Sequence, residues 1–591
     1  MLTYEFPASE LRYLMTDVFD LETVLCELGH DDLDCDTFFS VAETFGSFAR
    51  ETLLPLNAVG DREGAAFENG RVRAAPGFAE AYQAFCQDGW NGLACDPDYG
   101  GQGLPNLLHA AIRESMAGTN LSFSLLHELN FGVYKALKAH GSEALKSEYL
   151  PKIIDGSWTG TMCLTEPHCG TDLGLVRTRA RAEEDGTWRI SGTKIFITWG
   201  DHDLSDNIVH LVLARTAGAP AGHRGLSLFV VPGILPADGK FPGRRNTVQP
   251  VGIEEKMGIH GSPTCMLAFD DAVGWLVGEE TKGLAHMFTM MNAARLSIGL
   301  QGTGIAEVAL QSASAYAGER RQGRAPAGVA EPDSIADPLT VHPDIRRRLL
   351  EMRAMTEAGR AMTYQVGLLL DVSQSHKDPA KRAKAAERLS VLTPILKSAL
   401  SDIGFEVANG AVQIYGGHGY IAEQGIEQLM RDVRIASIYE GTNAVQARDL
   451  VSRKLAMAGS SVDALVEELA VETALLAEHP EFGGFGVRLD EAVQGLKRCT
   501  SWMKTNLTED PEAALAGACD YLNLFALALF GGLWGRMVRA AAIADVEPEF
   551  RDAKYAAATV FFNRILPRTA ALEVAVKAGP VPGVPEVERA A

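Results

Sequence analysis

The sequence reads WRISGTKIFIT over residues 188–198, IVHLVLAR over 208–215, GLSLFVV over 225–231 and TCMLAFD over 264–270. Each run is short and rich in β-branched and apolar residues, and glycine and aspartate separate the runs, a pattern typical of strands. We therefore expect a β-rich domain of about 115 residues between Thr161 and Trp275.

Helical periodicity dominates the sequence on both sides of this region. Between Leu284 and Arg321 there is no proline, and apolar residues recur at helical spacing. The same spacing predicts a helix after Pro343 and a third from about Pro379, which Pro394 should bend or break. Because strands and helices do not alternate along the chain, a doubly wound parallel sheet is excluded.

Three glycines, Gly299, Gly302 and Gly304, interrupt the first of these helices. Glycine is a poor helix former, so we expect these positions to allow close approach of a neighbouring helix. The segment GLQGTG (299–304) also resembles part of a dinucleotide-binding fingerprint, but it follows a helix rather than a strand. The pattern therefore favours packing over nucleotide binding.

The last part of the chain predicts a separate helical domain after Ser460. Helical patterns recur around 462–476 and 515–543, and the low-complexity stretch 323–338 upstream predicts an exposed loop between two helices. We find no internal repeat of 20–50 residues.

Composition and charge restrict the class of protein. The 591 residues are 47% hydrophobic and 22% charged, as in ordinary globular proteins. The 54 basic and 76 acidic residues give a net charge of −22, which argues against a nucleic-acid partner. The nine cysteines show neither disulfide-like nor zinc-binding spacing, so we expect reduced thiols and no metal.

Targeting and membrane signals are weak. The N-terminal residues lack a cationic start followed by an apolar core, so no signal peptide is predicted. The longest mostly apolar run, Leu522 to Trp534, has 13 residues, fewer than the roughly 20 that a membrane-spanning helix needs. We therefore expect a cytoplasmic protein that does not contact a membrane.

Two segments have an ordinary and a functional interpretation. Glu440, in IYEGTNAVQ (438–446), is either a surface carboxylate near a helix N-terminus or a base beside a pocket, with Ile438 and Tyr439 as apolar neighbours. The tract TMCLTEPHCGTD (161–172) is either a loop entering the β domain or a set of donors for a planar heterocycle and a pyrophosphate.

The glycines of GGHG (416–419) fit a helix C-cap. Signatures of serine hydrolases, P-loop proteins and zinc proteases are absent from the sequence.

Taken in order, six segments resemble the successive signatures of acyl-CoA dehydrogenases. The segments are TMCLTEPHCGTD (161–172), GTKIFITWG (192–200), EKMGIHGSPTC (255–265), MMNAARLSIGLQGTGIAEVAL (290–310), VQIYGGHGY (412–420) and MRDVRIASIYEGTN (430–443). The resemblance covers about residues 39–455. It implies a mainly α protein with a central β-barrel-like domain, in the family's α, β, α order, plus an additional C-terminal helical domain. The implied boundaries are 1–38 for an N-terminal extension, 39–160, 161–278, 279–458 and 459–591.

The resemblance also implies a reaction and a cofactor. Glu440 matches the family's catalytic base, which removes the α-proton of an acyl-CoA thioester while FAD accepts the β-hydride, giving a trans-2-enoyl-CoA. Some members place the base on the helix holding Met290 to Arg295, but the sequence MMNAAR contains no carboxylate. In that family, FAD lies between the β domain and the second helical domain and is completed by a neighbouring subunit, so the resemblance implies a homodimer. Electron-transfer flavoprotein is the implied electron acceptor.

Further residues match functional positions of the family. Those implied to bind FAD are Leu164, Thr165, Thr171, Phe196, Thr198, Arg320, Gln413, Gly416, Gly417 and Thr442. Those implied to lie near the substrate are Thr171, Arg295, Tyr439 and Gly441. Phe196 replaces the tryptophan found in many members, and the sequence RQGRA after Arg320 lacks the usual aromatic residue.

Within the family, the N-terminal extension, the C-terminal tail and the tract IFITWGDHDLSDNIVHLVLAR (195–215) resemble a large branch of roughly 590 residues. The best-defined activity of that branch is oxidation of 3-methylmercaptopropionyl-CoA in dimethylsulfoniopropionate breakdown. Alternatives are a dehydrogenase of broad chain-length range, an acyl-CoA oxidase, a DNA-associated flavoprotein of the same fold and a non-catalytic helical scaffold. The net charge and the intact YEGT segment argue against the DNA-associated protein.

Overall fold

The chain divides into two compact units, each assembled from separate segments of the sequence. The computed structural model describes residues 2–236, 243–457, 459–580 and 582–583. The first unit comprises Met1–Phe6, Ser40–Ala315 and Gly404–Ala436, and the second comprises Pro7–Phe39, Tyr316–Ile403 and Ser437–Ala591. The last predicted domain, 459–591, ends outside the described residues.

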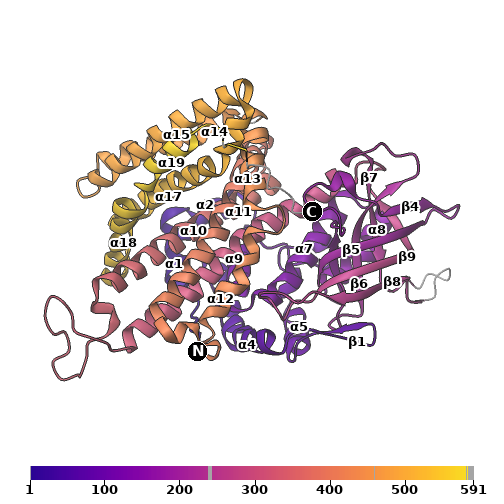
Figure 1. The fold of residues 1–591 in the computed structure, drawn as a ribbon, viewed down its shortest axis with the longest axis horizontal. Helices are drawn as coiled ribbons and strands as arrows, with labels where there is room; N and C mark the ends of the chain where they lie inside the picture. The colour runs from indigo at the N-terminus through magenta and orange to yellow at the C-terminus, as the bar shows by residue number, and fades with distance from the viewer. Residues whose placement is uncertain (1, 237–242, 458, 581, 584–591) are drawn as a thin grey trace, which may run out of the picture. The chain divides into compact units, whose positions relative to one another are not determined.

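A seven-stranded sheet lies in the first unit, as the strand-like runs predict (Figure 1). Its strands are β3 (Trp158–Cys163), β4 (Arg179–Ala182), β5 (Trp188–Thr198), β6 (Asn207–Thr216), β7 (Leu226–Pro232), β8 (Val248–Ile253) and β9 (Thr264–Val277). The order is β3-β6-β4-β5-β9-β7, with β8 paired to β9. An additional pairing of β7 with β6 closes five of the strands into a ring, so the sheet is barrel-like, as expected.

Alternation along the strands separates an inner core from an outer one. Val212 of β6, Phe229 of β7 and Phe269 of β9 belong to the cluster inside the ring. Leu211 and Leu213 point to the other face, where α7 and α8 cover the sheet. This period of two lets β6 be buried on both sides.

The first unit also contains helices. They are α4 (Leu54–Glu63), α5 (Phe78–Gln87), α6 (Asn106–Thr119), α7 (Leu121–His140), α8 (Glu143–Ile154) and α12 (Ile426–Val433), with parts of α3 (Cys35–Phe48), α9 (Gly283–Glu319) and α11 (Pro379–Tyr415). A short hairpin, β1 (Ala66–Glu68) and β2 (Arg71–Arg73), follows α4.

Two of the three glycines in α9 allow helices to touch. A Cβ on Gly304 would lie 2.3 Å from the carbonyl oxygen of Glu114 and 2.7 Å from the nitrogen of Gly118, in α6. A Cβ on Gly404 of α11 would lie 2.8 Å from Cα of Gly302. The predicted close approach is therefore confirmed at positions 302 and 304.

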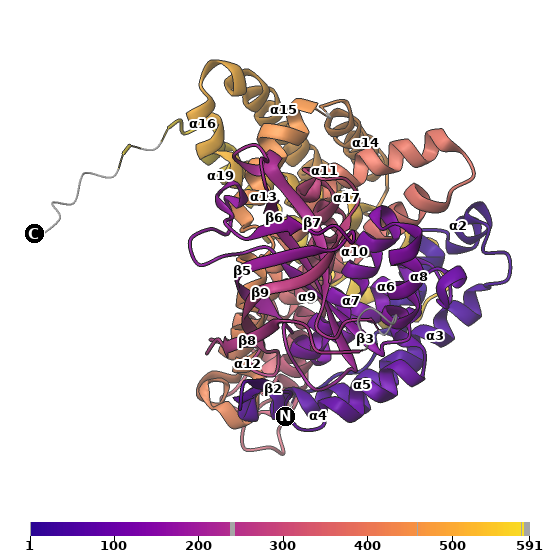
Figure 2. The same cartoon turned by 90° about the vertical axis from the view of Figure 1, so that its right-hand side faces the viewer.

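The second unit is helical. Its helices are α1 (Ala8–Tyr13), α2 (Leu21–Leu28), α10 (Pro343–Ser375), α13 (Asn443–Asp449), α14 (Gly459–Ala477), α15 (Gly483–Glu509), α16 (Pro511–Ala516), α17 (Ala518–Ile543), α18 (Pro548–Val560) and α19 (Arg568–Val576), with the remaining parts of α9 and α11. α15 and α17 each pack against α14 and α19, coloured orange to yellow in Figure 2. α18 packs against both α10 and α17, so the added C-terminal helices join the core of this unit.

The structure corrects the prediction of a helix break at Pro394. Pro394 neither ends nor interrupts α11, which runs unbroken from Pro379 to Tyr415. The buried side chains of Val391, Leu392, Ile395 and Leu396 on both sides of the proline hold the helix by packing despite the missing hydrogen-bond donor.

The apolar run 522–534 belongs to a helix longer than the run itself. α17 has 26 residues and is long and apolar enough to cross a membrane by length and composition alone, although 72% of its most apolar window is buried in the protein. Such burial is typical of the central helix of a packed domain.

Candidate active site

Glu440 lies in a short turn between α12 and α13, in a backbone conformation that residues with a side chain rarely adopt. Its φ is +54°, and Gly441 follows with a φ of +85°. For a residue other than glycine, a left-handed conformation costs of order 1–3 kcal/mol and persists only when its surroundings enforce it. The half-buried Glu440 is therefore held in place by neighbouring structure.

Gln446 is one of the groups that enforce this turn. Its buried amide nitrogen donates hydrogen bonds to the carbonyl oxygens of Glu440 (3.2 Å) and Gly441 (3.1 Å). A Cβ at position 441 would lie 2.9 Å from the same nitrogen, so only glycine fits there. Thr442 is the N-cap of α13, accepting a hydrogen bond from the backbone N–H of Val445 (3.4 Å).

Asn443 connects the turn to α11. Its Oδ1 accepts a hydrogen bond from the buried Lys397 (2.9 Å), and its Nδ2 donates to Asp402 (2.7 Å) and Ser401 (3.0 Å). The side chain of the first residue of α13 is thus fixed to the part of α11 that belongs to the same unit. The turn 439–442 is a preorganised element, as a base in a catalytic site requires.

In the first unit, the tract 161–172 is anchored by a buried ion pair. Lys194 of β5 is fully buried and donates to Glu166 (2.9 Å) and to the carbonyl oxygen of Leu164 (2.9 Å). Glu166 also accepts hydrogen bonds from the hydroxyl (2.6 Å) and the backbone N–H (3.0 Å) of Thr178 and from the backbone N–H of Arg177 (2.8 Å).

These donors decide the ionisation of Glu166. Burial opposes its charge, but Lys194 and the hydrogen bonds outweigh burial and lower its pKa to about 2. The depressed pKa contributes stability at neutral pH, which is lost as the pH falls below the ordinary glutamate value toward about 2.

Removing Lys194 tests this anchor. We expect Lys194→Ala to lower the free energy of unfolding by about 3–5 kcal/mol, because it leaves a buried carboxylate without its cation. The matched control is Lys146→Ala, whose ion pair with Glu143 (2.9 Å) lies at the surface, where such pairs contribute less than about 1 kcal/mol. Thermal melts of both variants give the comparison, and equal melting temperatures would contradict a structural role for Lys194.

The anchored tract runs beside the end of β5. The N–H of Ile195 donates to the carbonyl oxygen of Thr165 (3.0 Å), which places Thr165 next to Phe196. Phe196 has a φ of +57° at an irregularity in the β5–β9 pairing, and 59% of its surface is exposed. Thr198 is half-buried and Thr171 is exposed. An aromatic ring held outward beside hydroxyl groups is a surface on which a flat heterocycle can lie.

The other predicted residues belong to other elements. Arg295 is buried in α9, with its guanidinium 5.9 Å from the ring centre of Phe288. Gln413, Gly416 and Gly417 are exposed at the C-terminal end of α11, where Gly416 has a φ of +61°. Among the described residues, a Cβ on either glycine would meet no atom within 4 Å. In the second unit, Arg320 is exposed just beyond α9.

Two other polar groups belong to the first unit. Glu166, His168 and Cys169 offer ligand atoms within 4.8 Å of one another, but both oxygens of Glu166 already accept hydrogen bonds from the protein. A polar pocket of about 430 Å³, counting its open mouth, is lined in part by His202 and His210. Burial lowers the pKa of both histidines to about 3, so they are neutral, and none of the predicted site residues lines this pocket.

The sequence interpretation missed the residues that hold the site in place. Lys194, Gln446 and Lys397 were not singled out, although all three are fully buried. One signal was available for Lys194, because Ile190, Lys194 and Ile197 all face inward on β5, and a lysine on the core side of a strand needs a partner. Nothing comparable in the sequence marks Gln446 or Lys397.

Comparison with known proteins gives consistent matches along the chain. Residues 39–157, 161–272 and 281–455 match the models of the N-terminal, middle and C-terminal domains of acyl-CoA dehydrogenases. Residues 462–582 match a further model, described as acetyl-CoA dehydrogenase C-terminal like.

Among curated proteins, the chain is 41% identical over 570 residues to 3-methylmercaptopropionyl-CoA dehydrogenase of Ruegeria pomeroyi, covering 96% of both chains. It is 31% identical over 544 residues to a butyryl-CoA dehydrogenase of Syntrophomonas wolfei, covering 90% of this chain and 88% of the relative. Among solved structures, an acyl-CoA dehydrogenase from Bacillus anthracis complexed with FAD superimposes with a TM-score of 0.76 at 22% identity, covering 97% of this chain and 92% of the other.

Proposed function

The chain belongs to the acyl-CoA dehydrogenase family, and on that premise we propose that its preferred substrate is 3-methylmercaptopropionyl-CoA. It is an FAD-dependent oxidoreductase that dehydrogenates acyl-CoA thioesters. The observation that carries the substrate proposal is the 41% identity to a dehydrogenase of this compound across 96% of both chains. The product is then the corresponding trans-2-enoyl-CoA, within dimethylsulfoniopropionate breakdown.

We assign the role of catalytic base to Glu440. The strained, clamped turn at 439–442 supports this, because a base that removes a proton from carbon must be held within reach of it. Glu440 takes the α-proton, and its carboxylate becomes a carboxylic acid. FAD, when bound, supplies the acceptor for the β-hydride.

The thioester α-proton is too weakly acidic for a carboxylate in water. The backbone N–H of Glu440 serves as a donor to the thioester carbonyl, where negative charge develops, and one such donor is worth about 3–4 kcal/mol. Substrate binding expels water around Glu440, and desolvation raises the pKa of a carboxyl group, which makes it a stronger base. Gly441 keeps the space beside this carbonyl free of a side chain, and Tyr439, Thr171 and Arg295 are assigned to the substrate side.

The residues of this chain suit FAD. Phe196 presents an exposed ring for the isoalloxazine, and Leu164, Thr165, Thr171, Thr198 and Thr442 are assigned to the flavin and its pyrophosphate. The exposed and unobstructed backbone at Gly416 and Gly417 favours contact with a flavin held mainly by a second subunit, together with Gln413 and Arg320. We propose that the protein is a homodimer in the cytoplasm and that electron-transfer flavoprotein is its electron acceptor. We also propose the five domain boundaries that the sequence predicts.

Arg320 tests the shared flavin site. We expect Arg320→Ala to lose bound flavin and to shift the dimer toward monomer, because an exposed guanidinium that bridges to the neighbour's cofactor is removed. Gel filtration with absorbance at the flavin band measures both properties at once. Arg321→Ala, which removes a neighbouring arginine paired with Glu331 of its own loop, is the control. A wild-type protein that elutes as a fully flavinated monomer would contradict the homodimer.

Anaerobic flavin bleaching with a panel of acyl-CoAs tests the substrate. Pentanoyl-CoA is the matched comparison, because it places a methylene where 3-methylmercaptopropionyl-CoA has sulfur. We expect the sulfur compound to give the highest kcat/KM, by about tenfold or more over pentanoyl-CoA and butyryl-CoA. Preference for long straight chains would show a dehydrogenase of broad range instead. Peroxide release in air at the turnover rate would show an oxidase.

A further inference from the structure

Three residues other than glycine adopt left-handed conformations in two neighbouring segments of the β domain. Phe196 and Trp199 belong to the turn that ends β5, with φ of +57° and +51°, and Ile259 belongs to the loop before β9, with φ of +49°. Aromatic and β-branched residues rarely adopt this conformation. The segments touch, since the N–H of Trp199 donates to the carbonyl oxygen of Pro263 (2.7 Å) and Ile197 pairs with Cys265.

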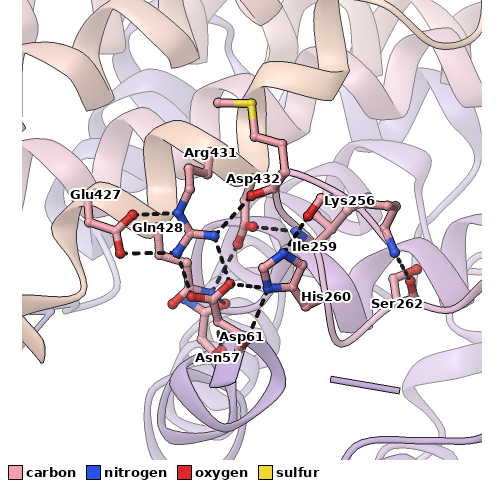
Figure 3. Close-up of polar contacts among 11 residues, drawn as sticks. Asn57, Asp61, Lys256, Ile259, His260, Ser262, Glu427, Gln428, Arg431 and Asp432 are labelled. Carbon is pink, nitrogen blue, oxygen red and sulfur yellow. Dashed lines mark hydrogen bonds and ion pairs between the residues drawn. The ribbon is translucent and has the colours of Figure 1, made fainter. Parts of the chain in front are cut away.

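A carboxylate from another helix holds the loop in this conformation. The N–H of Ile259 donates to Oδ1 of Asp432 (2.5 Å), in α12, and the N–H of Ser262 donates back to the carbonyl oxygen of Ile259 (3.0 Å) (Figure 3). Asp432 is 1% exposed, and its Oδ2 accepts from Gln428 (3.1 Å). A Cβ on Gly258 would lie 2.7 Å from Oδ1 of Asp432, so the carboxylate lies directly against the loop backbone.

The helix that carries Asp432 is itself fixed. Arg431 donates to both oxygens of Asp61 in α4 (2.9 and 2.5 Å), to Glu427 (2.5 Å) and to the carbonyl oxygen of Met257 in the loop (3.2 Å) (Figure 3). His260, also in the loop, lies 2.9 Å from Asp61. α4, α12 and the loop are thus joined by one polar network, in which the side chain of Asp432 forms the hydrogen bond to the strained residue.

Holding a loop with a buried carboxylate costs free energy, because burial opposes the charge of the carboxylate. Burial raises the pKa of Asp432 to about 6, against the donors around it that favour its charge. Packing alone could hold a loop with apolar side chains, so the carboxylate indicates that the particular backbone conformation at Ile259 matters.

We propose that Asp432 is a positioning residue for the dehydrogenation, acting through Ile259 and the contact at Pro263 on the turn that presents Phe196 and Thr198. This inference rests on the proposed function, which assigns those two residues to the isoalloxazine ring. Asp432 touches neither substrate nor cofactor in this scheme. It fixes where the aromatic ring and the hydroxyl group lie, and an error of 1 Å in such placement can slow a reaction about 10²-fold.

The test compares flavin-loaded variants under anaerobic conditions. We expect Asp432→Ala to retain FAD but to show an altered visible flavin spectrum and stronger flavin fluorescence, with acyl-CoA bleaching about 10- to 100-fold slower and KM changed less than about threefold. Asp432→Asn preserves the volume and one acceptor. Its bleaching should therefore be slower than that of wild type by at least about threefold, but faster than that of Asp432→Ala. Glu427→Gln, one turn earlier on α12 and bound to Arg431 but not to the loop, should stay within about twofold of wild type.

A rescue separates positioning from mere stability. Glycine adopts a positive φ freely, so adding Ile259→Gly to Asp432→Ala should restore the spectrum and recover bleaching about tenfold. If Asp432 only stabilised the fold, losing the buried Ile259 side chain as well would make the double variant worse. That result, or wild-type spectra and rates in both Asp432 variants, would overturn the proposal. A wild-type holoenzyme that no acyl-CoA bleaches would instead refute the proposed function, while the spectra would still report on Asp432.

Discussion

Glu440→Gln gives a yellow protein whose flavin is not bleached by acyl-CoA. The substitution keeps the size of the side chain and leaves the clamp by Gln446 on the backbone intact, so FAD binding is retained. An amide cannot accept the α-proton, and loss of a general base lowers rates by about 10²–10⁴-fold. Stopped-flow absorbance at the flavin band under anaerobic conditions measures this loss directly.

Two comparisons complete this experiment. Glu423→Gln removes an exposed carboxylate 17 residues upstream and should leave bleaching unchanged. Chemical reduction by dithionite should remain normal in Glu440→Gln, because only proton removal is lost. Bleaching of Glu440→Gln at near wild-type rates would assign the base to another residue, and a wild-type protein unable to take up FAD would refute the reaction.

Lys554→Ala should destabilise the second unit by about 3–5 kcal/mol or more. Lys554 is fully buried in α18, and its amine donates to Glu357 of α10 (2.8 Å) and to Glu10 of α1. The rings of Tyr13, Trp534 and Phe550 surround it. Without the lysine, the two buried carboxyl groups lose the cation that they share, although Glu357 keeps its ion pair with Arg353 (2.7 Å).

Thermal melts and limited proteolysis measure this effect. Lys504→Ala, which breaks an exposed ion pair with Asp463 (2.7 Å) in the same unit, is the matched control and should shift the melting temperature little. Glu10→Gln combined with Lys554→Met should recover part of the loss, because it removes charges together rather than singly. A melting temperature for Lys554→Ala equal to that of the control would show that the cluster contributes nothing.

Much of the fold could be predicted because its signals are local. The strand runs at 188–198 and 264–270 reappear as β5 and the start of β9, and the helix after Pro343 begins at that residue. The predicted runs do not include β3, β4 or β8, of which the last two are short and rich in arginine, glycine or proline. The pairings of β5 and β7 with β9 and the persistence of α11 through Pro394 depend on contacts between distant segments, which local patterns do not contain.

The candidate site, like the fold, combines features that the sequence predicts with features that it does not. Motif order predicts Glu440 and the tracts around Thr165 and Phe196 as site residues, because the chemistry proposed for them restricts residue types at those positions. The left-handed backbone of Phe196 and Glu440 could not be predicted, since nothing in their residue types favours a positive φ. The ion pair of Glu166 with Lys194 joins residues 28 apart, and Asp432 meets Ile259 across 173 residues.

The pairing of Lys554 with Glu10 also sets an order of events during synthesis. The first helix leaves the ribosome 544 residues before its buried partner. At about 5–20 residues per second, the apolar side of α1 waits roughly half a minute to two minutes before α17 and α18 exist to cover it. Residues 7–39 therefore emerge early and mature late, and a nascent chain stalled anywhere before α18 exposes a hydrophobic N-terminus to chaperones and proteases.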